Sequence, residues 1–448
     1  MKREMDMLNG SLWDKILMFA LPMALSGMLQ QLFTAADAAV VGRFAGKAAL
    51  AAVGSNTALV NLIINMFIGL TIGTSVLVAR YIGSGEKEKI TKTVHTSITV
   101  AAISGVLLIF IGWFASKQML QWMDTPSDVI DLATIYLRIY FCGMPFAMVY
   151  NFGVAILRSV GDTKRPLVIL VIAGIVNIIF NLIFVIAFDL HVIGVGVATV
   201  MSNILSAILV IYFLMKETGD IRLDLGKLGI DKQTLLGIMR IGIPAGLQNM
   251  VFSLSNVVIQ TSINGFGSTV VSAGAAVVNF EFLAWFIISA FVSAATTFVS
   301  QNYGAMKLDR CRKAVKISIG WCILFTAVFD IICYLLRYPL ISIFSTDATV
   351  VEIGIVRMKY ILMLNVIACI YEVLSGGMRG LGYSLSPAVL TVIGVCVLRL
   401  AWVYTVFPKT QTYESLLAVY PLSWIATNIM IITAYFLVIR KVRKSIRI

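Results

Sequence analysis

The chain has 448 residues, of which 59% are hydrophobic and only 13% are charged. Soluble domains carry about 25% charged residues, so this composition excludes a soluble enzyme, a disordered chain and a nucleic-acid-binding domain. A helix that crosses a bilayer needs about 20 apolar residues. The length therefore accommodates about twelve such helices with short loops, and it leaves no room for a further soluble domain.

Apolar stretches separated by polar turns predict an all-α polytopic membrane protein with twelve transmembrane helices. A backbone that crosses lipid must satisfy its own hydrogen bonds, which favours helices over other structures. Residues typical of turns mark the breaks, as at 83–85, 125–127 and 161–163. The predicted spans are residues 13–40, 53–79, 93–115, 132–157, 166–188, 192–215, 236–263, 273–300, 315–337, 353–378, 386–407 and 416–439.

Lys and Arg residues are distributed unevenly over the predicted loops. Of the 35 such residues, 26 fall in or near the two termini and the even-numbered loops, 8 fall on the opposite side or near that end of a span, and Arg399 alone is assigned to the interior of a span. Cytoplasmic loops carry an excess of this kind, so we expect both termini in the cytoplasm. The net charge of +13 has the same origin, and we expect no nucleic-acid partner.

An internal repeat relates the two halves of the chain. Shifting the sequence by 221 residues aligns four turn and kink residues within a stretch of 17 residues. Because each repeat holds six spans, both enter the membrane from the same side, and the two lobes are expected to be pseudo-symmetric. We predict an N-terminal six-helix lobe (1–215), a cytoplasmic linker (216–235) and a C-terminal six-helix lobe (236–448). The aligned pairs are Tyr150 with Tyr371, Arg158 with Arg379, Gly161 with Gly382 and Pro166 with Pro387.

Polar residues inside the spans of the first lobe suit a cation. Asp37 lies among small residues of the first span with no partner nearby in sequence, and an ionisable residue inside a span is a functional hypothesis by default. Asn177 and Asn181 share one face of the fifth span, and Thr199 lies in the sixth. Their oxygens are of the type that hard cations prefer, although such residues also bond helices together. With Asp37 they form a candidate site of one negative charge for H⁺ or Na⁺.

The second lobe carries a different set of ionisable residues inside its spans. Glu281, Glu372 and Arg399 suit either an internal ion pair or contact with a ligand, and the sequence leaves both interpretations open. Asp330 lies seven residues before Arg337 near the end of a span. For Asp330 we favour an internal pair or an interfacial position over a function.

Motifs for enzymatic chemistry are not found in the sequence. The segment 42–48 resembles a phosphate-binding loop, but it has three residues rather than four between its glycines, and Ala48 replaces the required Ser or Thr. The six cysteines form no CxxC pair, and no HExxH motif occurs. We therefore expect no enzymatic activity, no cofactor and no resident metal other than a coupling Na⁺.

Several motifs together carry a family resemblance over essentially the whole chain. They are Leu21-Pro22 followed by residues 37–43, residues 157–163 with Pro166, residues 194–199, and residues 378–382 with Pro387. In these motifs the chain resembles the bacterial branch of the multidrug and toxic compound extrusion (MATE) transporters. The resemblance implies a monomeric multi-pass antiporter of the bacterial cytoplasmic membrane, surrounded by membrane lipid. Its expected activity is export of organic cations or drugs in exchange for H⁺ or Na⁺ by alternating access.

The resemblance also implies roles for individual residues. In similar proteins an acid in the first span, an Asn and an Asp in the fifth and a Thr in the sixth bind the coupling ion. The corresponding positions here are Asp37, Asn177, Asn181 and Thr199, and Asn181 departs from the pattern because an acid is expected there. With one carboxylate left, a proton neutralises the site fully, so H⁺ coupling is favoured over Na⁺. We expect substrate contacts at Glu281, Glu372, Tyr150 and Arg399.

Two other functions fit a polytopic chain with this repeat. A flippase for a lipid-linked precursor would share the architecture but would favour a strongly basic cavity, whereas Arg399 is the one cation predicted inside a span. A receptor or scaffold without transport is the second alternative. The acids at span centres argue against it.

Overall fold

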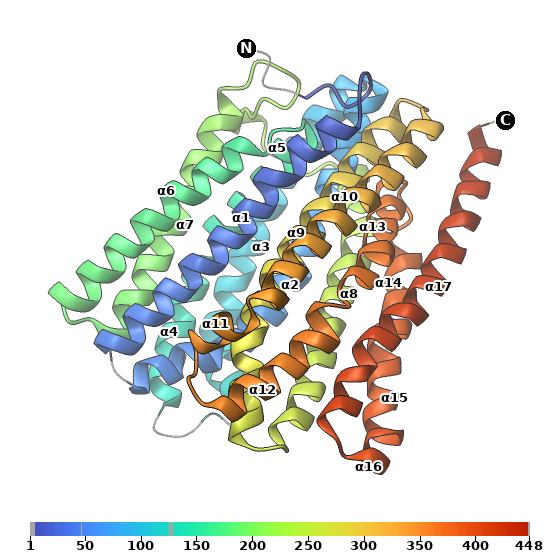
Figure 1. Ribbon diagram of the computed structural model, residues 1–448. Coiled ribbons are helices and arrows are strands. Elements are labelled where there is room, and N and C mark those ends of the chain that lie inside the picture. The colour runs from blue at the N-terminus through green and yellow to red at the C-terminus, as the bar shows by residue number, and fades with distance from the viewer. Residues whose placement is uncertain (1–4, 46, 124, 126–128, 447–448) are drawn as a thin grey trace. The chain divides into compact units, whose positions relative to one another are not determined.

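The computed structural model describes residues 5–45, 47–123, 125 and 129–446 of the chain. Over these residues the protein consists of helices joined by short turns, and they include no strand (Figure 1). Eleven helices are long and apolar enough to cross a membrane, and a twelfth span results if α4 (Ile130–Cys142) and α5 (Met144–Ser159), which meet at a bend of 46°, count as one. The predicted all-α polytopic membrane fold is confirmed.

The other elements follow the predicted spans with few interruptions, and α1 has the predicted bounds. The element η3 is a 3-10 helix, and the other η elements are π-helices. In chain order these elements are α1 (Trp13–Val40), η1 (Val41–Ala45), α2 (Lys47–Ser84), α3 (Lys87–Trp122), α6 (Lys164–Leu182), η2 (Ile183–Ala187), α7 (His191–Met215), η3 (Leu225–Lys227), α8 (Lys232–Asn264), α9 (Ser268–Gly304), α10 (Leu308–Leu335), α11 (Arg337–Ser342), α12 (Ala348–Arg357), η4 (Met358–Leu362), α13 (Val366–Gly380), α14 (Leu385–Thr391), η5 (Val392–Val397), α15 (Leu398–Thr405), α16 (Phe407–Thr410) and α17 (Tyr413–Ile446).

Two predicted spans are interrupted at equivalent positions of the repeat. The fourth (132–157) breaks at Gly143, because Pro145 has no N–H for the next helical hydrogen bond. The tenth (353–378) breaks over residues 363–365, between η4 and α13. Leu364 stands 221 residues after Gly143, so the repeat extends to the irregular parts of the spans.

The helices form two compact units, and each is described by itself. The first comprises Leu25–Gly242 with Met5, and the second comprises Asp6–Ala24 with residues 243–446. The division differs from the predicted lobes, because the first part of α1 belongs to the second unit and the first part of α8 belongs to the first unit. In both helices the boundary lies within two residues of a proline, Pro22 or Pro244.

Residues 6–24 belong to the second unit because α9 and α10 bind them directly. Arg310 of α10 donates from Nε to the Met7 carbonyl at 3.2 Å, and Asn302 of α9 donates from Nδ2 to the same oxygen at 3.2 Å. The Met7 side chain is fully buried. Further along α1, the Phe19 ring packs edge-on against Phe298 with 5.9 Å between centroids. Figure 1 shows α9 and α10 side by side in this unit.

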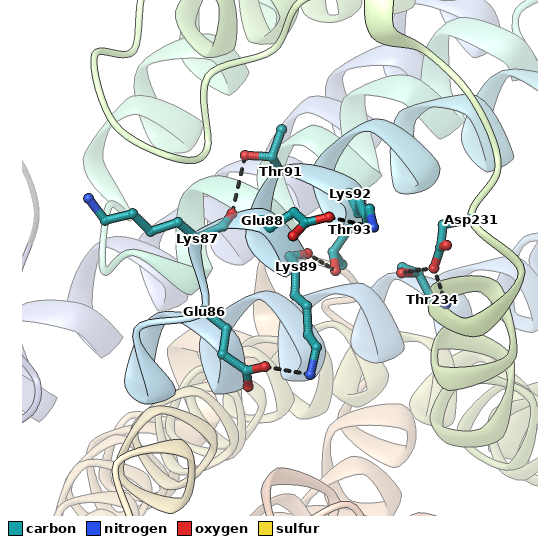
Figure 2. Close-up of polar contacts among 9 residues, drawn as sticks. All are labelled: Glu86, Lys87, Glu88, Lys89, Thr91, Lys92, Thr93, Asp231 and Thr234. Carbon is teal, nitrogen blue, oxygen red and sulfur yellow. Dashed lines mark hydrogen bonds and ion pairs between the residues drawn. The ribbon is translucent and has the colours of Figure 1, made fainter.

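The predicted linker (216–235) is packed against the first unit. It is shorter than predicted, because α8 begins at Lys232. The carboxylate of Asp231 caps α8 by accepting from the Thr234 amide at 2.8 Å and from its hydroxyl at 2.7 Å (Figure 2). These bonds from Thr234 also hold the pKa of the Asp231 carboxyl below its usual value. The Asp231 amide donates to Thr96 of α3 at 3.1 Å, and the Asp224 amide donates to His95 Nε2 at 3.1 Å.

A glycine allows the first turns of α8 to approach α2. At Gly73 any Cβ would lie 2.3 Å from the Ile238 carbonyl oxygen. Val76 and Leu77 pack against Ile238 in the same place as a separate apolar cluster. Because the obstructing atom belongs to the backbone, a larger residue at position 73 displaces α8 from the first unit.

We expect Gly73→Ala to destabilise the protein by about 1–3 kcal/mol through this overpacking. Thermal unfolding of the purified protein in detergent, followed by intrinsic fluorescence, measures the effect as a lower Tm. Gly54→Ala is the matched control in the same helix, since no atom lies within 4 Å of its added Cβ. Equal melting temperatures for Gly73→Ala and the wild type would contradict the close packing of α2 and α8.

Candidate functional site

Asp37 of α1 accepts hydrogen bonds from two asparagine amides of α6. Asn181 donates from Nδ2 to Asp37 Oδ1 at 2.6 Å. Asn177 lies within reach of the same carboxylate: in the orientation that satisfies both groups, its amide nitrogen faces the acid and donates to Oδ1 at 2.7 Å and to Oδ2 at 3.1 Å. Both asparagines are buried, and Asp37 is partly exposed. Three of the four residues predicted for the ion site therefore lie together.

A close approach between α1 and α6 keeps the carboxylate against the amides. Phe33 lies one turn before Asp37, and Gly174 lies about one turn before Asn177. A Cβ at position 174 would meet the Phe33 ring at 2.1 Å. The absence of a side chain at Gly174 thus lets the two helices come close enough for direct hydrogen bonds.

Both helices leave the α-helical pattern directly after the site. The helix α1 passes into η1 four residues after Asp37, and α6 passes into η2 two residues after Asn181. The two π-helices contact each other. Single π-helical turns inside α-helices occur frequently at functional sites. The carboxylate and its amides thus lie where the backbones of both helices are least regular.

Thr199, the fourth predicted residue, lies on α7 beside α6 (Figure 1). Its hydroxyl donates to the Val195 carbonyl of its own helix at 3.0 Å, and no hydrogen bond within the described part of the chain joins it to Asp37. Tyr136 of α4, which the sequence analysis did not single out, lies within electrostatic reach of Asp37. Its ring packs 6.1 Å from that of Tyr140, and this i,i+4 aromatic spacing was the available signal.

The second unit neutralises one of its acids internally. Arg357 at the end of α12 donates from Nε to Glu281 Oε1 at 2.7 Å and from Nη2 to Oε2 at 2.9 Å. Its side chain is buried, and two parallel bonds of this kind are the strongest form of ion pair. Of the two interpretations left open for Glu281, the structure shows the internal pair. This pair was not predicted, because the distribution of basic residues assigned Arg357 to the cations outside the membrane.

Arg399 of α15 is buried without an acidic partner. It donates from Nε to Ser423 at 3.1 Å and from Nη1 to Asn256 at 3.4 Å. The guanidinium carbon lies 4.2 Å from the centre of the Tyr420 ring. Glu372 of α13 is also buried, and within the described residues no ion pair of 4.0 Å or less involves Glu372 or Arg399.

The residues predicted to contact substrate come from both units. Tyr150 lies on α5 of the first unit, where its ring packs against the apolar core of that unit. Glu281, Glu372 and Arg399 belong to the second unit. Glu281 is committed to Arg357, so Glu372 is the acid of this set without an ion pair among the described residues.

Comparisons with known proteins relate the chain to a family of multidrug transporters. The sequence profile of the MatE family matches residues 22–183 and again residues 244–405. The chain is 26% identical to the probable multidrug resistance protein YoeA of Bacillus subtilis, covering 98% of this chain and 96% of that protein. It is 25% identical to the probable multidrug resistance protein NorM of Thermotoga maritima, covering 86% and 84%. A solved outward-facing MATE transporter of the MOP superfamily superimposes with a TM-score of 0.91 at 22% identity, covering 98% of both chains.

The pair of Glu281 and Arg357 predicts a clear pattern in a double-mutant cycle. Removing one partner of a buried ion pair costs about 3–5 kcal/mol, whereas replacing both by apolar residues is close to neutral. We therefore expect Glu281→Leu to lower the Tm strongly and the double variant Glu281→Leu/Arg357→Met to restore most of it.

The control for this cycle is Glu352→Leu, because Glu352 is an exposed acid on the same helix as Arg357. It is expected to leave the Tm nearly unchanged in detergent. If Glu281→Leu is as stable as the control, the ion pair does not contribute to the fold and Glu281 is free to contact a ligand.

Proposed function

The chain belongs to the MatE family of multidrug efflux transporters, and on this premise we propose that it is a secondary antiporter for organic cations or drugs. The resemblance inferred from the sequence motifs is confirmed. In the proposed activity, export of the substrate is driven by entry of H⁺ or Na⁺ at Asp37. Glu372 and the surrounding residues of the second unit supply substrate contacts.

The observation that carries this proposal is the environment of Asp37. Its carboxylate accepts N–H bonds from Asn177 and Asn181 and has no cationic partner within the described residues. Neutral N–H donors stabilise the ionised carboxylate without fixing its charge permanently. A cation that binds Asp37 therefore requires the amides to reorient. Because these hydrogen bonds join α1 and α6, the contact between the two helices changes as well.

The same environment favours H⁺ as the coupling ion. Na⁺ needs several oxygen ligands in place of its hydration shell. In the orientation in which both amides hydrogen-bond to Asp37 they present nitrogen, so both would have to rotate before their oxygens could bind Na⁺. A proton needs one carboxylate oxygen, and one rotated amide is enough to accept the new O–H bond. Protonation is thus the smaller rearrangement.

Coupling follows if ion and substrate stabilise different conformations. In the outward-open state a proton binds Asp37 and the substrate leaves to the outside. The protonated protein then opens to the cytoplasm, the proton leaves, and a new substrate binds from that side. The exchange is obligatory because the conformation that binds the substrate is not the one in which Asp37 is protonated.

The flippase alternative gains support from two further buried cations, Arg357 and Arg379. However, Arg357 is neutralised by Glu281, and Arg379 donates to Gln248 at 2.9 Å within electrostatic reach of Glu372. Arg399 makes no ion pair within the described part of the chain, but Glu281 lies within its electrostatic reach. A diphosphate needs more positive charge than this, so we retain the antiporter.

We propose that both termini face the cytoplasm of a bacterial cell. Ser84 at the end of α2 and Ser445 near the end of α17 are exposed. In a variant without its native cysteines, Ser84→Cys and Ser445→Cys are expected to react only with reagents that cross the membrane. Thr410→Cys, exposed at the end of α16, is the control that an impermeant maleimide labels from outside. Labelling of Ser84→Cys by the impermeant reagent in intact cells would contradict this orientation.

Asp37→Asn is expected to abolish coupled transport, because an amide cannot take up the proton. The assay uses purified protein in vesicles and follows accumulation of ethidium, a permanent cation, under separately imposed H⁺ and Na⁺ gradients. In the wild type the H⁺ gradient drives accumulation. In Asp37→Asn the ethidium ratio falls to its equilibrium value of about one while ethidium binding in detergent remains.

Asn181→Asp is the matched variant at the same site. It restores the acid present in similar proteins, doubles the negative charge, and is expected to increase accumulation driven by Na⁺ relative to H⁺. Concentration of ethidium by Asp37→Asn against its gradient would mean that the coupling residue lies elsewhere. Failure of the wild type to respond to either gradient would refute the antiporter itself.

A further inference from the structure

Asp330 is a buried acid inside a span of the second unit, and it has no hydrogen-bond or ion-pair partner in the described part of the chain. It lies on α10, five residues before the end of that helix, and its side chain is only 1% exposed. Within the described residues neither carboxylate oxygen has a hydrogen-bond partner. Asp37, by contrast, accepts from two amides. The two acids therefore differ in how their charge is offset.

The expected pair with Arg337 is not formed. Arg337 donates from Nη1 to the Tyr334 carbonyl at 3.0 Å. Its guanidinium carbon lies 4.8 Å from the centres of both the Tyr334 and the Tyr338 rings. The side chain of Asp330 is buried inside the protein and does not reach its surface. Of the two interpretations that the sequence favoured for Asp330, the internal pair is therefore wrong.

No other charge neutralises Asp330. The elements α9, α11, α13 and η4 pack against α10, and α1 joins them through Trp13 and Trp321. None of their charged residues lies within 4.0 Å of this carboxylate in the described structure. Glu281 is bound to Arg357, Arg379 donates to Gln248, and Lys359 is exposed. Glu372 lies near Cys322, two turns away along α10. The titratable residue nearest in sequence on α10 is Cys333, one turn further on.

A purely structural role does not explain this residue. A buried polar group without a hydrogen bond costs about 1–3 kcal/mol, and more when it is charged. An apolar residue of similar size would fill the same volume without that cost. This acid lies inside a membrane span and weakens the fold there. Its presence is explained if it binds an ion.

We propose that Asp330 is a second proton-binding site, carried by the second unit and used only in cycles that Asp37 couples. The carboxylate takes up H⁺ to form the neutral acid when the transporter is open to the outside, and it releases H⁺ when the transporter is open to the cytoplasm. Each cycle then exchanges two protons for one substrate molecule. This inference rests on the proposed antiport and adds its stoichiometry.

Stoichiometry sets the limit to which a substrate can be concentrated. With the membrane potential clamped at zero, each coupled proton multiplies the limiting ratio by the imposed proton ratio. A tenfold proton gradient thus supports a limit of about 100 for two protons and about ten for one, since each tenfold ratio is equivalent to 1.4 kcal/mol. The experiment measures, in vesicles, the ethidium ratio at which net flux stops.

We expect a limit near 100 for the wild type, near ten for Asp330→Asn, and near one for Asp37→Asn. Asp330→Glu keeps the acid and is expected to retain the wild-type limit. Asp309→Asn, which changes an exposed acid on the same helix, is the matched control and is expected to retain it too. Asp330→Leu is expected to raise the Tm or leave it unchanged.

Equal limits for the wild type and Asp330→Asn would overturn the proposal while leaving antiport at Asp37 intact. A lower Tm for both Asp330→Asn and Asp330→Leu, together with loss of ethidium binding, would show a structural role and overturn it as well. A wild type that concentrates no ethidium under a proton gradient would instead refute the proposed antiport.

Discussion

Charge is costly inside a bilayer, and the surroundings of the buried ionisable groups in this chain differ in how they offset that cost. Asp37 receives two neutral N–H donors, Glu281 receives a guanidinium, and Arg399 is held by a hydroxyl, an amide oxygen and an aromatic face. Each arrangement joins residues of at least two helices. A change of charge at one of these residues therefore alters helix packing, which is the physical requirement for coupling an ion to a conformational change.

The two halves of the repeat share the positions of their helix breaks and prolines, but they bind their buried acids in different ways. The break at Gly143 and the break over residues 363–365 occupy equivalent places, and Pro22 and Pro244 both mark a boundary between units. In the first unit the acid is held by amides, which can reverse donor and acceptor. In the second unit Glu281 is held by an arginine, which stays protonated. The first unit is thus suited to take up and release a proton, and Glu281 is suited to hold the fold.

The spans and the core of the site could be predicted from the sequence because the bilayer imposes their length and makes polar residues conspicuous. The bounds of α1 agree with the predicted 13–40, and the i,i+4 pair of Asn177 and Asn181 lies against Asp37 as spacing suggested. The pair of Glu281 and Arg357 was missed, because hydropathy assigns a charged residue at the end of a span to a loop. The exchange of residues 6–24 and 232–242 between units was missed too, since backbone carbonyls and Gly73, rather than a side-chain pattern, direct it.

Coupling between protonation of Asp37 and binding of the substrate is tested most directly by counting protons. Ethidium carries a permanent charge and takes up no proton itself. Added to detergent-solubilised protein in a weakly buffered solution, it is expected to release protons from the wild type, detected with a pH-sensitive dye. Asp37→Asn is expected to release about one proton fewer for each ethidium bound. Ethidium binding with no proton release from the wild type, or with equal release from both proteins, would contradict coupling at Asp37.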